Sequence, residues 1–214
     1  MNRYQKRARI FAATLSALAG FVDAIGFVES GGFFVSFMSG NSTRLGVGLA
    51  ASLSHAALAG GLILAFVVGV AAGSLVGHAA GERRRAGAVL LAIAMLLLAA
   101  ATVGVGGWHF TALGLTGIAM GAENAIFERG GEVRIGLTYM TGSLVRAGQG
   151  LAGMVLGRPA GDWPWYMVLW GGFVAGAVAG AAAHPEIGLS ALFAAGGMAL
   201  ALALVANRLV RDAA

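Results

Sequence analysis

Residues 37–50 read FMSGNSTRLGVGLA, and residues 139–152 read YMTGSLVRAGQGLA. Seven of these fourteen positions are identical at an offset of 102 residues, and Arg44 corresponds to Arg146. Upstream, residues 20–25 (GFVDAI) correspond to residues 121–126 (GAENAI) at an offset of 101. Because matches in separate places share nearly one offset, we infer that the chain contains an internal repeat.

A third match lies downstream of the first two, in a glycine pattern with a spacing of four residues. At an offset of 103, the matching glycines are Gly69, Gly73 and Gly77 in the first half and Gly172, Gly176 and Gly180 in the second. Small residues at this spacing allow membrane helices to pack closely. We therefore assign both glycine patterns a structural role.

The composition is that of a membrane protein. Of 214 residues, 58% are hydrophobic and only 11% are charged, whereas a soluble domain carries about 25% charged residues. About 20 apolar residues are needed to cross a bilayer. The sequence predicts six such spans, at about 10–28, 56–77, 86–106, 109–127, 164–183 and 187–206, and two apolar segments too short to span, at about 39–54 and 141–157.

The basic residues predict the orientation. If the N-terminus is cytoplasmic, all of the 14 Lys and Arg residues except Arg44 fall on the cytoplasmic side. We therefore expect both termini and the loop at 83–85 in the cytoplasm of a bacterial inner membrane, with residues 107–109 and 184–186 outside. The basic charge then orients the chain and attracts membrane lipids, and a nucleic-acid surface is not expected.

Three spans in each half force the second half to enter the membrane from the opposite side. The predicted fold is an all-α polytopic membrane protein of one domain, 1–214, with six transmembrane helices in two inverted repeats (about 10–106 and 109–206). Each repeat contains a short half-helix after its first span. Inverted repeats with discontinuous helices are typical of secondary transporters, although the same duplication can build a channel or a scaffold.

The segments GFVDAIGF (20–27), FMSGNSTRLG (37–46) and YMTGSLVRAG (139–148) resemble the YoaK-like family of bacterial six-span membrane proteins, a domain of unknown function numbered 1275. The resemblance covers nearly the whole chain. It implies an inner-membrane protein with the same number of spans, and it implies no particular substrate.

Carboxylates inside spans are costly and find partners or a wet cavity. Asp23 lies in the first predicted span, and Glu123 and Asn124 lie in the fourth. One interpretation is that the two carboxylates bind a proton or a cation. The alternative is that each forms a buried ion pair, Asp23 with Arg44 and Glu123 with Arg146.

The two short segments carry hydroxyl and amide side chains near their starts. We predict that Ser39, Asn41, Thr141 and Ser143 act as helix N-caps, so that each half-helix N-terminus and its arginine could bind an anion. The alternative is that these side chains only satisfy the backbone of a re-entrant helix.

No enzyme motif, cofactor or metal site is predicted, because the chain has no cysteine and its four histidines lack ligand spacing. Our hypothesis is a transporter of a small solute or ion, with its site between the two half-helices. The candidate residues are Asp23, Ser39, Asn41, Arg44, Glu123, Asn124, Thr141, Ser143 and Arg146. The alternative is a non-transporting membrane scaffold or assembly factor, and the sequence leaves open whether the protein forms a homo-oligomer.

Overall fold

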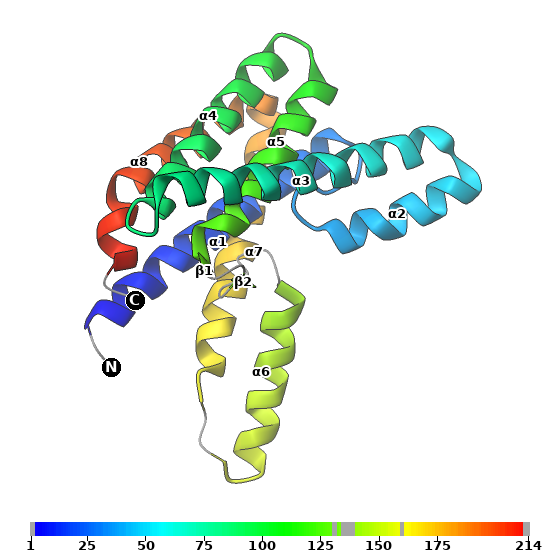
Figure 1. Cartoon of the computed structure of the whole chain (residues 1–214). Coiled ribbons are helices and arrows are strands. Elements are labelled where there is room, and N and C mark those ends of the chain that lie inside the picture. Colours follow the sequence, from blue (N-terminus) through cyan, green and yellow to red (C-terminus); the bar gives the residue numbers. More distant parts are fainter. Residues whose placement is uncertain (1–2, 130–131, 134–139, 159–160, 212–214) are drawn as a thin grey trace.

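A computed structural model describes residues 3–129, 132–133, 140–158 and 161–211, and this part of the chain is almost entirely helical (Figure 1). The helices are α1 (Arg3–Glu29), α2 (Met38–Ala51), α3 (Leu53–Ala80), α4 (Arg85–Val105), α5 (His109–Glu123), η1 (Asn124–Phe127), α6 (Met140–Val155), α7 (Trp163–Ile187), η2 (Gly188–Ser190) and α8 (Ala191–Arg211). Two short strands, β1 (Glu128–Arg129) and β2 (Glu132–Val133), form an antiparallel pair between η1 and α6.

Glycines with positive φ end two of the long helices. α3 stops before Gly81, which has φ +75°, and α7 stops before Gly188, which has φ +56°. Other residues rarely adopt this backbone conformation, so glycine provides a sharp helix end. α7 begins with Trp163 and Pro164, and proline suits the first turn because its missing N–H would have no partner there.

Five segments of the described chain are long and apolar enough to cross a membrane. They are Arg9–Glu29, Leu53–Ala80, Arg85–Val105, His109–Phe127 and Trp163–Ala206. The last has 44 residues and contains α7 and most of α8. Large aliphatic side chains such as Leu64, Val67 and Leu75 point outward from α3, as lipid contact requires. The chain is therefore a membrane protein, as its composition predicted.

Most of the packed helix pairs are distant in sequence. α1 lies against α7, α3 lies against α5, and α4 lies against both α5 and α8 (Figure 1). The buried side chains of these helices form one apolar core that includes Leu15, Ile25, Leu90 and Ile93. The short helices α2 and α6 each pack on the helix that follows them, α3 and α7.

Glycines bring the paired helices into backbone contact. A Cβ atom added to Gly176 of α7 would meet the carbonyl oxygen of Ala17 in α1, and one added to Gly69 of α3 would meet the carbonyl oxygen of Ile118 in α5. The reciprocal contacts are Gly20 with the Phe173 carbonyl and Gly121 with the Phe66 carbonyl. No larger residue fits at such a crossing, and close approach also allows Cα–H···O contacts between the helices.

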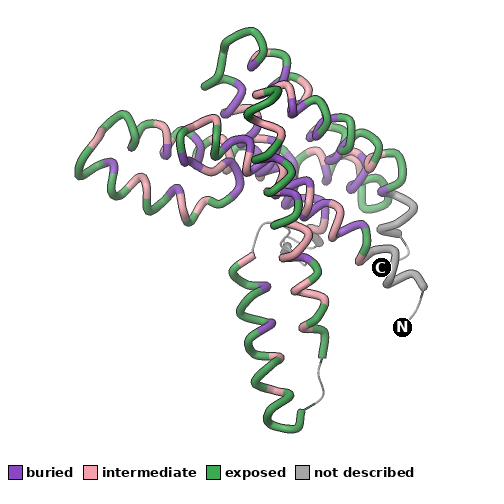
Figure 2. The backbone as a smooth tube through the Cα atoms, turned by 180° about the vertical axis from the view of Figure 1, so that it is seen from behind, coloured by how far each residue is buried: buried purple, intermediate pink, exposed green. Residues whose placement is uncertain are grey.

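Two helical hairpins project from the core in different directions (Figures 1 and 2). The first arm consists of α2 and the start of α3 (residues 38–61), and the second arm consists of α6 and the start of α7 (residues 140–158 and 161–168). Most residues of both arms are exposed (Figure 2). The arms hold α2 and α6 apart, so the expected site between two adjacent half-helices does not form.

Candidate functional site

Asp23 of α1 fixes the non-helical segment that leads into α2. Its Oδ1 accepts hydrogen bonds from the backbone N–H groups of Val35 (2.9 Å) and Ser36 (2.8 Å). The carboxylate is 6% exposed. Since Asp23 is six residues from the end of α1, these bonds draw the chain back along the helix before α2 begins.

Asn41 of α2 holds the same segment from the other side. Its Oδ1 accepts from the Phe34 N–H (3.0 Å), and its Nδ2 donates to the Phe34 carbonyl (2.6 Å). The side chain is completely buried. Both ends of the amide are therefore used, which explains why asparagine suits this position.

Arg44 does not pair with Asp23, so the first predicted ion pair is wrong. Its guanidinium carbon lies 5.0 Å from the ring centre of Phe33, 5.9 Å from that of Phe34 and 6.0 Å from that of Phe27. Cation–π attraction at these distances stabilises the charge. Among the described residues, no carboxylate and no hydrogen-bond acceptor contacts the Arg44 guanidinium.

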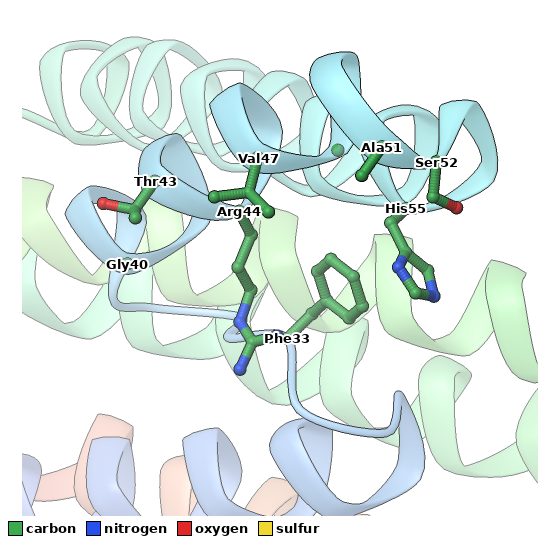
Figure 3. A pocket seen from close by; sticks show the side chains of 9 residues that line it. Phe33, Gly40, Thr43, Arg44, Val47, Ala51, Ser52 and His55 are labelled. Carbon is green, nitrogen blue, oxygen red and sulfur yellow. The ribbon is translucent and has the colours of Figure 1, made fainter.

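A cavity of about 480 Å³ opens beside Arg44 in the first arm (Figure 3). It is lined by Phe33, Gly40, Thr43, Arg44, Val47, Gly48, Ala51, Ser52 and His55. The Phe33 ring lies between Arg44 and His55, and the Phe33 and His55 ring centres are 5.7 Å apart (Figure 3). The cavity thus combines one cation, several polar groups and an apolar wall.

The predicted N-caps are wrong. α2 begins at Met38 with Phe37 in the cap position, and no side chain caps it. Ser39 and Asn41 therefore lie inside the first turn. Thr141 and Ser143 likewise lie within α6, which begins at Met140. Ser39 and Thr141 are exposed, whereas Ser143 is buried.

The corresponding carboxamide and carboxylate of the second half behave differently. Asn124 donates through Nδ2 to the carbonyls of Met120 (3.3 Å) and Gly121 (3.1 Å) in the preceding helix α5. Glu123 is 2% exposed, and neither carboxylate oxygen has a hydrogen-bond partner among the described residues. The second predicted ion pair, Glu123 with Arg146, is therefore wrong as well.

Arg146 lies on the surface of the second arm. It donates through one terminal nitrogen to the Tyr166 hydroxyl (3.2 Å), and its guanidinium carbon lies 5.0 Å from the Tyr166 ring centre. The candidate residues are thus spread over three places: Asp23, Asn41 and Arg44 around the first arm, Glu123 and Asn124 in the core, and Arg146 on the second arm.

A second cavity, of about 330 Å³, lies between α1, α7 and α8. Its lining is mostly alanine and glycine, and its single hydroxyl, that of Thr14, donates to the Ile10 carbonyl. Such a lining can accept a hydrocarbon chain, but it offers a polar solute no directional contact.

The sequence did not predict the charged contacts that join helix ends. Glu29 accepts from His184 (2.7 Å) and also contacts His109. Glu128 accepts from Ser74 (2.6 Å) and lies 3.6 Å from Arg85. These residues lie at or near the ends of apolar runs. That position is the signal that the sequence offered for such contacts, but it does not show which residues pair.

Comparisons with known proteins place the chain in a family. A family model described as a protein of unknown function, DUF1275, matches residues 11–205. The chain belongs to the DUF1275 family. The UPF0700 transmembrane protein RA0705 of Rhizobium meliloti (strain 1021) is 39% identical over 200 residues, which cover 93% of this chain and 86% of that protein. No solved structure matches the chain.

Proposed function

We propose that this DUF1275 protein is an inner-membrane transporter of a small solute, with six spans in two inverted three-span halves. The helix pairing supports the inverted halves. The first helix of each half packs on the third helix of the other half: α1 on α7, and α5 on α3. A two-fold axis in the membrane plane would exchange these two pairs.

The glycine contacts support the same symmetry and refine its register. Ala17 and Ile118 are 101 residues apart, and the glycines that approach them, Gly176 and Gly69, are 107 residues apart. The Gly20 and Gly121 contacts give the same two offsets. The third helices of the two halves therefore correspond at an offset of 107, one helical turn from the 103 that the glycine pattern predicted.

The polar contacts at the helix ends support the proposed orientation. Arg9 pairs with Asp162 at 2.7 Å, and Arg85 lies near Glu128, so these contacts join segments that we expect in the cytoplasm. Glu29 joins His109 and His184, which we expect outside. Both termini are then cytoplasmic by the positive-inside rule.

One observation carries the transport hypothesis. The non-helical segment 33–37, held by Asp23 and Asn41, borders a cavity whose arginine has no counter-ion among the described residues. Irregular backbone at membrane depth is tolerated where it is buried in protein or lines a cavity. Discontinuous helices beside such cavities form the substrate sites of many transporters. We accordingly place the proposed site in the first arm instead of between α2 and α6.

The competing hypothesis is a scaffold, and one observation favours it. Asp23 and Asn41 are occupied by backbone groups of the chain itself, as purely structural residues would be. Under this hypothesis the arms are surfaces for another membrane protein, and no solute crosses.

Alternating access separates the two hypotheses. The chain has no cysteine, so Thr43→Cys introduces a single thiol at the cavity. In proteoliposomes, a transporter should expose this thiol to an impermeant maleimide from each side in turn, while a control thiol at Arg84→Cys should react from one side only. Reaction of the Thr43→Cys thiol from one side only, under all solutes tested, would favour the scaffold.

A further inference from the structure

We infer that the cavity of the first arm binds a small organic monocarboxylate through Arg44. This inference rests on the proposed transport function, for which it names the substrate class.

The argument begins with the charge of Arg44. Arginine is always protonated, and a charge at a membrane helix normally has an acidic or carbonyl partner. Arg44 has neither among the described residues, because Asp23, the nearest buried carboxylate in sequence, is bonded to the amides of Val35 and Ser36. A bound ligand with one negative charge would neutralise the Arg44 guanidinium.

The aromatic rings determine how that charge can approach. Phe27, Phe33 and Phe34 surround the guanidinium at 5.0 to 6.0 Å, and a Cβ atom added to Gly32 would lie 3.1 Å from one of its terminal nitrogens. The rings offer the guanidinium no hydrogen-bond acceptor, and among the described residues its N–H donors, which lie in one plane as a fork, have no hydrogen-bond partner. A planar carboxylate matches this fork with two parallel hydrogen bonds.

The remainder of the lining defines the body of the ligand. Phe33, Val47 and Ala51 give an apolar wall, and Thr43, Ser52 and His55 are the other polar residues of the lining. The Thr43 hydroxyl donates to the Ser39 carbonyl and the Ser52 hydroxyl is bonded to that of Ser54, so each keeps only part of its hydrogen-bonding capacity for a ligand. One formal positive charge with an apolar wall favours a monoanion with a short hydrocarbon or aromatic part over a phosphate dianion. An anionic lipid headgroup is the other source of a single negative charge, and the test separates the two.

The experiment uses the full-length protein in nanodiscs of zwitterionic phosphatidylcholine, titrated with benzoate or butyrate and, for comparison, with inorganic phosphate or chloride. We expect saturable thermal stabilisation by a carboxylate only. Arg44→Gln should lower the affinity at least about tenfold, since a charge-assisted hydrogen bond contributes about 1.5–3 kcal/mol and 1.4 kcal/mol is tenfold.

Two further variants keep the test decisive. Arg84→Gln, at an exposed loop arginine away from the cavity, should bind like the wild type. Val47→Phe fills the cavity from a side chain that is 63% exposed, so it should fold and lose binding even if Arg44→Gln does not fold.

Three outcomes would overturn the inference: no saturable response to any carboxylate, an equal response in Val47→Phe, or stabilisation by phosphatidylglycerol discs alone. Carboxylate flux into proteoliposomes is measured separately. Carboxylate binding without flux would contradict the proposed transport function but support the carboxylate site. Flux of another solute without carboxylate binding would support transport but contradict the carboxylate site.

Discussion

The two arms carry a repeated motif in which seven of fourteen positions are identical, yet their arginines lie in different surroundings. In the first, Arg44 lies among three phenylalanine rings beside a cavity, and in the second, Arg146 rests on the Tyr166 ring at the surface. One difference lies in the residue that corresponds to Asp23. Asp23 accepts hydrogen bonds from Val35 and Ser36 in the segment before α2, whereas the corresponding Asn124 donates to carbonyls of the preceding helix α5. A shared motif therefore does not imply a shared role.

The largest expected effect comes from comparing Asp23 with Asn124, the corresponding residue of the second half. Asp23→Ala removes the acceptor of two buried amides, each costing about 1–3 kcal/mol when unsatisfied, so the free energy of unfolding should fall by about 4 kcal/mol. Asn124→Ala should cost less than about 1 kcal/mol, because its bonds are made to carbonyls that already belong to α5. Reversible unfolding in mild detergent measures both. Equal losses of unfolding free energy in Asp23→Ala and Asn124→Ala would contradict the difference between the two halves. Asp23→Asn keeps an acceptor oxygen, so it should be nearly as stable as the wild type.

The next prediction concerns the feature that the halves share. Gly176→Ala and Gly69→Ala each place a methyl group on a facing carbonyl, so each should cost about 3 kcal/mol. Gly171→Ala is the matched control, since open space surrounds that position and alanine favours the helix. The same unfolding assay applies. If one crossing tolerated alanine and the other did not, the proposed symmetry between them would be contradicted.

A smaller difference in unfolding free energy is expected between substitutions at Asn41 and at the corresponding Ser143. Asn41→Ala removes two hydrogen bonds to Phe34 and should cost about 2 kcal/mol. At the corresponding place, Ser143→Ala should change the free energy of unfolding by less than about 1 kcal/mol, because no hydrogen bond of Ser143 is found among the described residues. A loss at Ser143 as large as that at Asn41 would mean that both segments are held alike.

The smallest effect is a coupling energy. Because Asp23 and Arg44 do not pair, the effects of Asp23→Asn and Arg44→Gln should add to within about 0.5 kcal/mol in a double-mutant cycle. Rescue of one substitution by the other, which a buried ion pair predicts, is not expected. Thermal unfolding of the four proteins gives the coupling directly.

Much of the fold was predictable from composition and length. The short segments expected at about 39–54 and 141–157 are α2 at 38–51 and α6 at 140–155, and most long helices match their expected ranges within a few residues. Apolar runs of this length determine helices almost by themselves, since no other element satisfies its backbone in lipid.

The residue offset that relates α3 to α7 was less predictable, for a physical reason. Glycines recur every four residues in α3 and α7, so a shift by one helical turn places glycine on glycine again. An offset of 103 pairs three glycines and an offset of 107 pairs two, so the sequence alone favours 103. The carbonyls that Gly69 and Gly176 approach support 107 instead.

The partners of the polar residues could not be predicted either. Charge alone suggested Asp23 with Arg44, because opposite charges attract in a medium of low dielectric constant. In the structure, the N–H groups of Val35 and Ser36 satisfy Asp23, so Asp23 is not available to pair with Arg44. Three aromatic rings surround Arg44 instead, and its counter-ion is the bound carboxylate that we propose. The cluster Phe27, Phe33, Phe34 and Phe37 was the signal in the sequence, although aromatic residues there could equally have faced lipid.

The pairing of α1 with α7 has a consequence for how the protein is made. Ser16 donates to the carbonyl of Leu169, 153 residues further along the chain. At a synthesis rate of about 5–20 residues per second, α1 enters the membrane roughly 8–30 s before its packing partner leaves the ribosome. During that time the face around Gly20 meets only lipid or the insertion machinery. Mutations on this face should therefore reduce the yield of inserted protein even where the folded protein would tolerate them. The cause is quality control acting on α1 before α7 has been synthesised.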